Sequence, residues 1–591
     1  GKNREILLRK RNELLDKLFA NGTIDKTTCE LSKAEQLPGE PKALPQLAPH
    51  LLDRFKKEYA VAKKTNKELA TSTQTTIDIN LQKQVNTIVW LHQQQLKGNQ
   101  INNAAAMVMD VESGNVLAYI GNIYNPADAA LESHVDVLSS VRSPGSTLKP
   151  ILYAALLTEG NLLPHQLIPD IPTQIGGYTP QNFDLGYDGA VPANRALARS
   201  LNIPAVRMLQ QYKYQRFYDV LKSCGITSLT HPPDFYGMSL ILGGCEISPF
   251  ELAGVYASMA RMYLHQDKNN GKNNPQDWFM PNYMLNPLPK RTSPNMIVPA
   301  HFDYVALWHT FNAMNEVMRP GEEGLWNLFS SAQRIAWKTG TSFGFRDGWA
   351  IGLTPKYCVV VWVGNTTGVG RPDLTGINTA APIMFDIFRQ LPATQWFQPP
   401  SSGFMYIPVC KYSGYKAGVD CASADTIMLS ESAKIAGACP YCRKIHLDAS
   451  GIYRVNESCE SPSNMQHKSW FVLPPVIEYY YKQKHPEYQS LPAYKAGCVV
   501  DAARVLDIIY PDEGAKIYVP LEINGERGKA VFKATHRSGN AKLFWHLDNM
   551  FIGTTQQFHQ MAVSPAPGKH LITVVDEQGN GMSRNFEIVD K

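Results

Sequence analysis

Apolar residues recur at the spacing of an amphipathic helix in two stretches near the start of the chain. Residues 81–96 form one of them, and in the other the apolar positions are Ile6, Leu7, Leu14, Leu15, Leu18 and Phe19. Asn21-Gly22 ends the first predicted helix, and Thr23 begins a second, short one. Three prolines then predict a linker: Pro38, Pro41 and Pro45.

Strand-like apolar runs occur in two groups that a long, mainly helical stretch separates. The first group, residues 105–110 and 116–120, flanks a turn and predicts a hairpin. The second group comprises residues 337–342, 347–353 and 357–363. We expect both groups to form one antiparallel, five-stranded sheet covered by helices, which gives an α+β fold over residues 75–400. Residues 265–300, rich in Asn, Pro and Lys, predict a surface insertion.

The last part of the chain has a different rhythm. Short strand-like runs alternate with turns throughout residues 503–591. The runs are 515–523, 529–534, 542–547, 558–562, 570–576 and 583–589. This alternation predicts a β-sandwich with Trp545 in the middle of its core.

The segment 143–150 carries the first chemically informative pair. Pro144-Gly145 predicts a turn and good helix formers follow, so we expect Ser146 to open a helix. Residues three apart share a helix face, which places Ser146 beside Lys149. A serine becomes a nucleophile when a base takes its proton, and a lysine is such a base only if burial or another cation lowers its pKa. The same spacing occurs elsewhere, at Ser413 and Lys416, so the pair alone is not specific.

Two further motifs follow along the chain. Ser200 and Asn202 lie in a predicted connection between helices, but four other Ser-x-Asn sequences occur, each in a predicted surface turn. Lys338-Thr339-Gly340 is the only Lys-Thr-Gly, and Gly340 on its strand would let a substrate or another backbone approach closely. The order Ser-x-x-Lys, Ser-x-Asn, Lys-Thr-Gly is typical of penicillin-recognising serine acyltransferases.

On these residues the chain resembles the class A penicillin-binding proteins. The resemblance includes the flanking stretches 142–150, 242–246 and 362–365 and extends over nearly the whole chain. It implies a DD-peptidase/β-lactamase-like transpeptidase domain that cross-links peptidoglycan stem peptides through a serine acyl-enzyme and is acylated by β-lactams. The alternatives are a D,D-carboxypeptidase or β-lactam hydrolase using the same residues, and a non-enzymatic envelope scaffold.

The resemblance also implies a role for each motif residue. Ser146 would be the nucleophile and Lys149 its base, with Lys338 as the neighbouring cation. Ser200 would pass the proton to the leaving amine, and Asn202 would hold Lys149 and the substrate amide. The backbone N–H groups of Ser146 and Thr341 would form the oxyanion hole. The substrate-binding residues would be Thr339, Gly340 and Thr341.

The resemblance assigns the other parts of the chain as well. Residues 1–74 resemble the tail of a glycosyltransferase domain and its linker. A motif of the Glu-Asp-x-x-Phe type is absent, so we expect glycosyltransferase activity only in a longer parent protein. Residues 401–502 would be a cysteine-rich connecting segment, and residues 503–591 an immunoglobulin-like domain that braces or binds. Its expected partner is a bacterial α2-macroglobulin-like protein or another envelope protein.

The composition of the chain limits which partners and which cellular location we expect. The 591 residues are 44% hydrophobic and 18% charged, as in a globular protein with ample core. The net charge of +5 argues neither for nor against a nucleic-acid partner. Because the sequence shows no basic stripe with interleaved aromatic residues, we expect no nucleic-acid partner. No apolar run approaches the roughly 20 residues of a membrane span. We therefore expect a soluble fragment from the periplasmic face of the bacterial inner membrane, with the membrane anchor in the parent.

Six of the ten cysteines lie between residues 401 and 500. The Cys439-x-x-Cys442 spacing allows a redox dithiol, half of a zinc site, or part of a disulfide framework. Because an envelope protein meets an oxidising compartment, we favour disulfides, with one joining Cys410 to Cys421, and we expect no metal and no cofactor. The disulfide candidates are Cys410, Cys421, Cys439, Cys442, Cys459 and Cys498. The free core thiols are expected to be Cys29, Cys224, Cys245 and Cys358.

Overall fold

The computed structural model describes residues 3–37, 46–64, 73–125, 131–173, 175, 178–266, 268, 274–285, 302–320, 333–435, 437–498, 505–520, 528–577 and 579–589. These residues fall into two compact units, residues 1–47 and residues 48–591. The first unit is a helical hairpin of α1 (Arg4–Ala20) and α2 (Lys26–Ala34), as the sequence predicts. The Asp25 side chain caps α2 by accepting the Thr28 N–H. The predicted proline linker falls in 38–45, outside the described residues.

The second unit is built on a five-stranded antiparallel sheet in the order β2-β1-β7-β6-β5. Its strands are β1 (Asn103–Asp110), β2 (Val116–Ile120), β5 (Ala336–Thr341), β6 (Asp347–Leu353) and β7 (Tyr357–Gly364). The β1–β7 pairing, which sets Ala105 opposite Trp362, joins the two groups of strands. The prediction of one antiparallel sheet made from both ends of the domain is confirmed.

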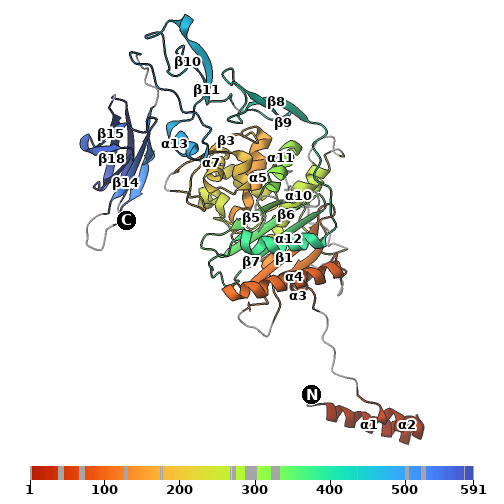
Figure 1. Cartoon of the computed structure of the whole chain (residues 1–591). Helices are drawn as coiled ribbons and strands as arrows, with labels where there is room; N and C mark the ends of the chain where they lie inside the picture. The colour runs from red at the N-terminus through yellow and green to blue at the C-terminus, as the bar shows by residue number, and fades with distance from the viewer. Residues whose placement is uncertain are drawn as a thin grey trace. The chain divides into compact units, whose positions relative to one another are not determined.

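Helices cover both faces of this sheet, which is why its strands are almost continuously apolar (Figure 1). Successive residues of β1 alternate between two cores: Met107 packs on one side and Val108 on the other. The smaller core includes α4 (Ile79–Leu96) and α12 (Ala381–Gln390). The larger core includes α5 (Lys149–Glu159), α7 (Asn202–Tyr212), α8 (Tyr214–Ser223), α10 (Pro249–Leu264) and α11 (Tyr304–Asn315).

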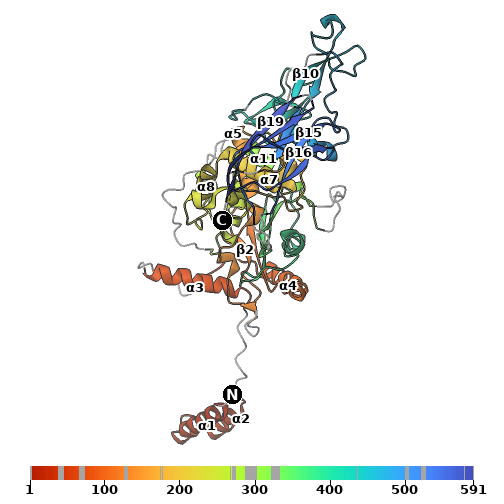
Figure 2. The ribbon, with the colours of Figure 1, turned by 90° about the vertical axis from the view of Figure 1, so that its left-hand side faces the viewer.

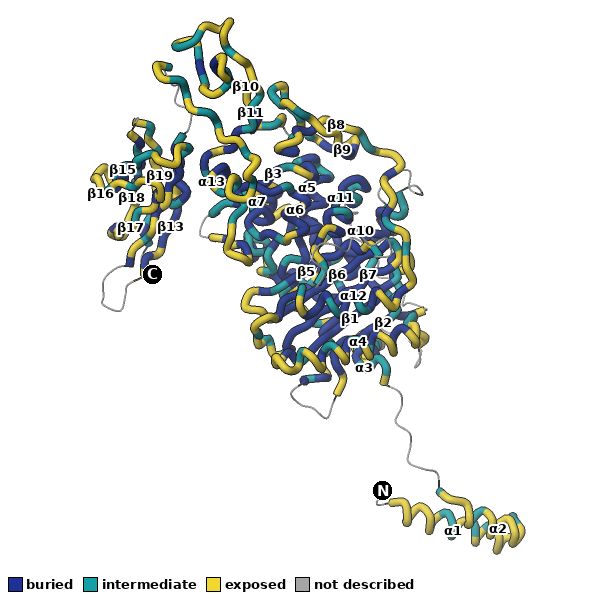
Figure 3. Tube along the Cα trace, viewed as in Figure 1, coloured by how far each residue is buried: buried dark blue, intermediate teal, exposed yellow. Residues whose placement is uncertain are grey.

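The helices of the larger core gather on one side of the sheet. In Figure 2, α5, α7 and α11 lie together, away from α4, and Figure 3 shows the core helices and central strands as mostly buried. A capping box of Ser248 and Glu251 starts α10. The remaining helices and strands of this domain are α3 (Pro49–Lys64), β3 (Leu167–Asp170), β4 (Gly189–Pro192), α6 (Ala193–Ala198) and α9 (Pro233–Tyr236).

Two sequence expectations need correction in this unit. Residues 1–74, expected to be a glycosyltransferase tail and linker, also include the helix α3, whose Leu51 is buried in the larger core. Within the expected surface insertion, Trp278 and Tyr283 are buried in that same core, so residues 274–285 are a structural part of the domain. The rest of that insertion up to residue 300 lies largely outside the described residues.

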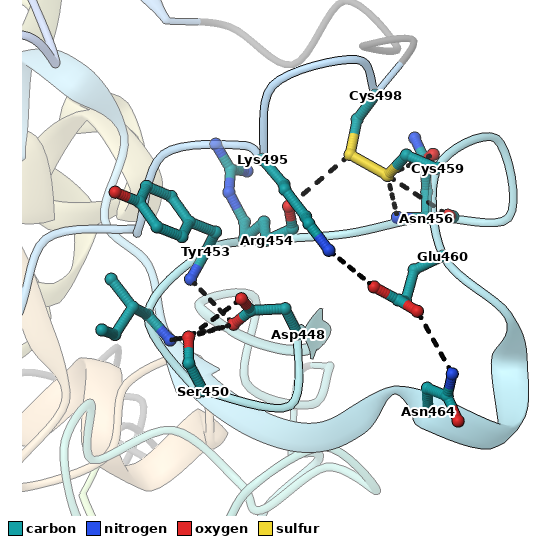
Figure 4. Close-up of polar contacts among 11 residues, drawn as sticks. Asp448, Ser450, Tyr453, Arg454, Asn456, Cys459, Glu460, Asn464, Lys495 and Cys498 are labelled. Atoms are coloured by element: carbon teal, nitrogen blue, oxygen red, sulfur yellow. Dashed lines mark hydrogen bonds and ion pairs between the residues drawn. A yellow bond between two sulfur atoms is a disulfide. The ribbon is translucent and has the colours of Figure 1, made fainter.

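The cysteine-rich segment folds into two strand pairs and a helix. These are β8 (Phe404–Cys410) with β9 (Ala424–Ser430), β10 (Cys442–Leu447) with β11 (Gln466–Phe471), and α13 (Pro475–Lys484). Its disulfide joins Cys459 to Cys498, beside the Lys495–Glu460 ion pair of 2.8 Å (Figure 4). The expected Cys410–Cys421 disulfide is wrong, because Cys410, Cys421, Cys439 and Cys442 are all free thiols.

The C-terminal part consists of two sheets around one core. One sheet has the order β12-β14-β17 and the other β13-β19-β18-β15-β16. Trp545 is fully buried in this core, as predicted, and donates from Nε1 to Thr555 Oγ1 over 2.8 Å. The strands are β12 (Leu506–Tyr510), β13 (Ala515–Tyr518), β14 (Ala530–His536), β15 (Lys542–Leu547), β16 (Met550–Gln556), β17 (Gln560–Val563), β18 (Gly568–Asp576) and β19 (Gly581–Val589). The sequence pattern missed β12 and β16, and β13 ends before the predicted residue 523.

Candidate active site

Ser146 lies in a single 3-10 turn, Gly145–Leu148, that runs directly into α5. The predicted helix start is therefore confirmed, with a tighter first turn. Gly145 has a φ of +53°, and a Cβ there would come within 2.6 Å of the Thr341 backbone nitrogen. Glycine is required because the turn carrying Ser146 presses against the backbone of β5. The motif serine and the Lys-Thr-Gly strand are neighbours for this reason.

The Lys149 side chain is 1% exposed and is held by three acceptors. Its Nζ donates to the Ser200 carbonyl at 2.7 Å, the Leu201 carbonyl at 3.0 Å and Asn202 Oδ1 at 2.8 Å. Burial, and secondarily the charge of Lys338, lowers the pKa of Lys149 well below its ordinary value. Burial thereby disfavours the ammonium form relative to a lysine in water, and the three acceptors can stabilise the ammonium once Lys149 has taken a proton.

Ser200 connects the two lysines. Its carbonyl accepts from Lys149, while its Oγ accepts a 2.7 Å hydrogen bond from Lys338 Nζ. Ser200 has a φ of +58°, a backbone conformation that residues other than glycine rarely adopt. Its surroundings therefore hold this part of the backbone in place. Lys338 is fully buried, and burial lowers its pKa to about 7. Lys338 can therefore change protonation state near neutral pH.

The strand β5 brings the Lys-Thr-Gly motif alongside the serine turn. A Cβ on Gly340 would come within 2.3 Å of the Pro144 carbonyl oxygen and 2.9 Å of Thr147 Cγ2. A Cβ on Gly376 would in turn come within 2.5 Å of the Gly340 carbonyl oxygen. Gly340 therefore lets another part of the backbone approach closely. This is one of the two alternatives that the sequence left open, the other being a substrate. Thr341 Oγ1 accepts the Gly376 N–H at 3.0 Å, and the side chains of Thr339 and Thr341 are half-buried at the strand edge.

One polar residue that supports the site escaped the sequence analysis. Asn182 is buried, and its Oδ1 accepts the backbone N–H groups of Asn202 at 2.9 Å and Ile203 at 3.2 Å. Its amide donates to Asp170 Oδ1 at 2.8 Å. Asn182 thus fixes the first turn of α7, from which the Asn202 side chain reaches Lys149. A lone asparagine in a loop gives no sequence signal for this role.

Exposed aromatic side chains lie on two loops beside these residues. The ring of Phe183, next to Asn182, packs edge-on against Phe345, which follows β5, with 6.0 Å between ring centroids. Phe343 in the same loop is 100% exposed. These rings offer apolar surface to a ligand that approaches the motif residues.

The second Ser-x-x-Lys match does not join this site. Ser413 is buried in the cysteine-rich segment, with its Oγ 3.1 Å from Cys439 Sγ. Lys416 forms a backbone bridge with Ala438 in the same segment. The structure thus brings together Ser146, Lys149, Ser200, Asn202, Lys338, Thr339, Gly340 and Thr341 through contacts and shared elements, and leaves Ser413 and Lys416 elsewhere.

Comparison with known proteins finds similar domains and a similar fold. Residues 104–389 match the penicillin binding protein transpeptidase domain, and residues 495–586 match the Penicillin-Binding Protein C-terminus Family. The crystal structure of penicillin-binding protein 1A from Haemophilus influenzae shares the fold, with a TM-score of 0.54 and 17% identity over 73% of this chain and 83% of that chain.

Two curated relatives match by sequence. Penicillin-binding protein 1C of Escherichia coli (strain K12) is 31% identical over 376 residues, which cover 63% of this chain and 44% of that protein. Penicillin-binding protein 1B of Vibrio cholerae is 28% identical over 275 residues, which cover 44% of this chain and 32% of that protein. The chain thus spans less than half the length of either relative.

The fold and the domain match point to one class of protein: residues 104–389 match the penicillin binding protein transpeptidase domain, and the relatives that the chain resembles are penicillin-binding proteins. Within that class, its similarity to penicillin-binding protein 1C extends over more of the chain than its similarity to protein 1B.

Among the helices of the described ranges, none combines the length and apolar character that a bilayer crossing requires.

Proposed function

We propose that this chain is a serine D,D-transpeptidase that cross-links peptidoglycan stem peptides and is acylated by β-lactams. The main support is the convergence of three separate motifs. Lys149 donates a hydrogen bond to Asn202 and Lys338 donates one to Ser200, beside the turn that carries Ser146. A buried lysine with a lowered pKa next to a serine is an activated nucleophile pair.

Acylation follows from this arrangement. Ser146 Oγ attacks the carbonyl carbon of the penultimate D-alanine of a donor stem, while Lys149 takes the hydroxyl proton. Ser200 then delivers a proton to the amine of the leaving terminal D-alanine, and an ester to Ser146 remains.

Substrate recognition rests on β5 and the serine turn. The backbone N–H groups of Ser146 and Thr341 form the oxyanion hole, and the close approach of Gly145 to Thr341 supports this pairing. Thr339 and Thr341, on the half-buried edge next to Lys338, bind the substrate carboxylate. The aromatic pair Phe183 and Phe345 lies where the stem peptide enters.

The acyl-enzyme is resolved by the amine of a second stem, which forms the cross-link. The D,D-carboxypeptidase and β-lactam hydrolase alternatives use the same residues and differ in admitting water at this step. A scaffold role without chemistry is the less supported alternative, because Lys149 and Lys338 are buried at a cost that stability alone does not require.

We extend the proposal to the intact protein and its setting. Residues 1–74 are the tail of a glycosyltransferase domain that a longer parent contains, and residues 75–400 are the transpeptidase domain. Residues 401–502 are the connecting segment, and residues 503–591 an immunoglobulin-like domain. The protein works at the periplasmic face of the inner membrane, where the C-terminal domain meets an α2-macroglobulin-like or other envelope protein. Supporting observations are the two-sheet architecture and the Cys459–Cys498 disulfide.

The decisive experiment is mass spectrometry of the protein after treatment with a penicillin. We expect one adduct, located by peptide mapping on Ser146. The lifetime of that adduct then separates the enzymes: hours are expected for a penicillin-binding protein, milliseconds for a β-lactamase. An adduct on another residue, or none, would refute the proposed chemistry.

A further inference from the structure

Four cysteines that are far apart in the sequence converge in the connecting segment. The Sγ atoms of Cys410, Cys421, Cys439 and Cys442 all lie within 4.8 Å of one another, and Cys410 and Cys442 are 3.5 Å apart. All four are free thiols, whereas Cys459 and Cys498 in the same segment are joined as a disulfide. The structure thus separates two kinds of cysteine that the sequence could not distinguish.

The dimensions of this cluster fit one tetrahedral metal ion. Zinc binds thiolates at about 2.3 Å, which puts the sulfurs of a tetrahedral site about 3.8 Å apart. The 3.5 Å between Cys410 and Cys442 and the 4.8 Å upper limit lie around that value. A disulfide would require a pair at about 2.0 Å. A multinuclear iron–sulfur cluster would spread its four thiolates more widely than a single ion does.

The surrounding groups suit thiolate ligands. The Gly418 N–H donates to Cys421 Sγ at 3.3 Å, and the Ser413 hydroxyl lies 3.1 Å from Cys439 Sγ. Such donors orient thiolates and stabilise their charge. Two ligands are buried and two half-buried, so the cluster is mostly shielded from solvent. The buried Ser413, which the transpeptidase site does not use, here gains a role.

The backbone preorganises the four ligands. Cys410 ends β8 and Cys442 begins β10, so each half of the cluster is anchored on a strand. Lys416 bridges both halves: its backbone pairs with Val409 and with Ala438, and its carbonyl accepts the Cys439 N–H at 2.8 Å. The four cysteines therefore bring together two chain segments, 410–421 and 439–442, that are separated in the sequence.

We propose that Cys410, Cys421, Cys439 and Cys442 bind one structural zinc ion that braces the connecting segment against the transpeptidase domain. The ion replaces the thiol protons, and its four protein ligands leave no open position for catalysis. The segment needs such a brace because the two apolar clusters that it forms within the described residues are small. Each has five buried members, and Leu163, Leu167 and Ala190 among them come from the transpeptidase domain.

The brace reaches toward the candidate active site. Tyr441, between two of the ligands, packs with Leu167 of β3 and Ala190 of β4. The Ser413 carbonyl accepts the Leu167 N–H at 2.8 Å. Because β4 leads directly into α6, after which Ser200 follows, the proposed zinc site stabilises the support of one motif residue without contacting substrate. Its role is therefore positional and independent of the proposed acylation chemistry.

The test is metal analysis of the whole chain, purified without reductant or chelator, with zinc as the only metal added before dialysis. We expect about one zinc per chain, released when a thiol reagent modifies four cysteines. Cys442→Ser should reduce the bound zinc at least tenfold, whereas Cys224→Ser, which alters a buried thiol outside the cluster, should leave it unchanged. Chelation should lower the melting temperature of the wild type and not that of Cys442→Ser.

Three outcomes would overturn the proposal. The first is wild-type protein without metal whose intact mass shows two disulfides besides Cys459–Cys498. The second is four free thiols with no retained zinc, and the third is iron in place of zinc. None of these depends on the penicillin adduct at Ser146, so failure of the metal site and failure of the proposed enzyme function are distinguishable.

Discussion

Lys338 Nζ donates a 2.7 Å hydrogen bond to Ser200 Oγ across 138 residues of chain. This contact fixes the hydroxyl of the middle motif relative to β5, while the Ser200 carbonyl accepts from Lys149. A single serine thus couples the two buried lysines of the site. The coupling links the Ser-x-x-Lys segment to the Lys-Thr-Gly strand through the middle motif.

We predict that Ser146→Ala abolishes covalent labelling by a fluorescent penicillin, because the ester forms on this hydroxyl. Gel fluorescence after labelling measures the effect. Ser413→Ala is the matched control, since Ser413 has the same Ser-x-x-Lys spacing but lies beside Cys439. Loss of labelling in Ser413→Ala with retention in Ser146→Ala would reverse the assignment.

We predict that Lys149→Ala slows acylation by ~10²–10⁴-fold, the usual contribution of a general base. The second-order rate constant for penicillin acylation measures this effect. Circular dichroism should show a folded protein. Lys416→Ala serves as the control and should acylate at the wild-type rate. A folded Lys149→Ala protein that acylates normally would show that another group takes the proton.

The lowered pKa of Lys338, about 7 in the folded protein, predicts a pH-dependent stability. An unfolded lysine titrates near about 10.4, so between these values the unfolded chain binds more protons and folding becomes more favourable as the pH rises. The slope for one such group is at most about 1.4 kcal/mol per pH unit. Below pH 7 both states are protonated, and this contribution to the slope disappears.

Urea unfolding of the wild type and of Lys338→Met at pH 6, 7, 8 and 9 measures this slope, since the remaining titrations are common to both proteins. Above about pH 7, the free energy of unfolding of the wild type should rise with pH relative to that of the variant. Parallel pH profiles would mean that Lys338 keeps its ordinary pKa.

We predict that Asn182→Ala slows acylation about tenfold or more, although Asn182 lies outside all three motifs. Its Oδ1 holds the Asn202 backbone N–H at 2.9 Å, and Asn202 in turn holds Lys149. The acylation rate constant, measured with saturating β-lactam, separates loss of alignment from loss of affinity. Asn464→Ala, at an exposed site in the connecting segment, is the control. Equal rates in the two variants would remove Asn182 from the site.

An ion pair links Arg537, in the β14–β15 loop of the C-terminal part, to Glu478 in α13. The Glu478 side chain is only 3% exposed, so Arg537→Ala leaves a buried carboxylate without this partner. We predict a loss of about 3–5 kcal/mol in the free energy of unfolding, with partial recovery in Arg537→Ala/Glu478→Ala. Lys516→Ala, which removes an exposed partner of Glu587, should cost at most about 1 kcal/mol. Similar losses in both single variants would contradict this prediction.

The sequence alone determined the local elements and the spacing of the candidate pair Ser146 and Lys149. Periodicity located α1, α4, the β1–β2 hairpin and the strands β5, β6 and β7, because side-chain alternation reflects which faces are buried. The spacing of Ser146 and Lys149 placed them on one turn, since a helix fixes the geometry of residues three apart. Trp545 was recognisable as core because so large an apolar residue between turn signals must be buried.

Only the tertiary structure decided which distant residues meet. Ser-x-Asn occurs several times, and the contact of Lys149 with Asn202 selects one of them. Asn182 gave no signal, because its role depends on where a loop passes the start of α7. The cysteines allowed many pairings, and the folding of β8 and β10 joined four thiols while leaving Cys459 to bond Cys498. Local pattern encodes burial and spacing, whereas contacts between distant segments arise only when the chain closes around a common core.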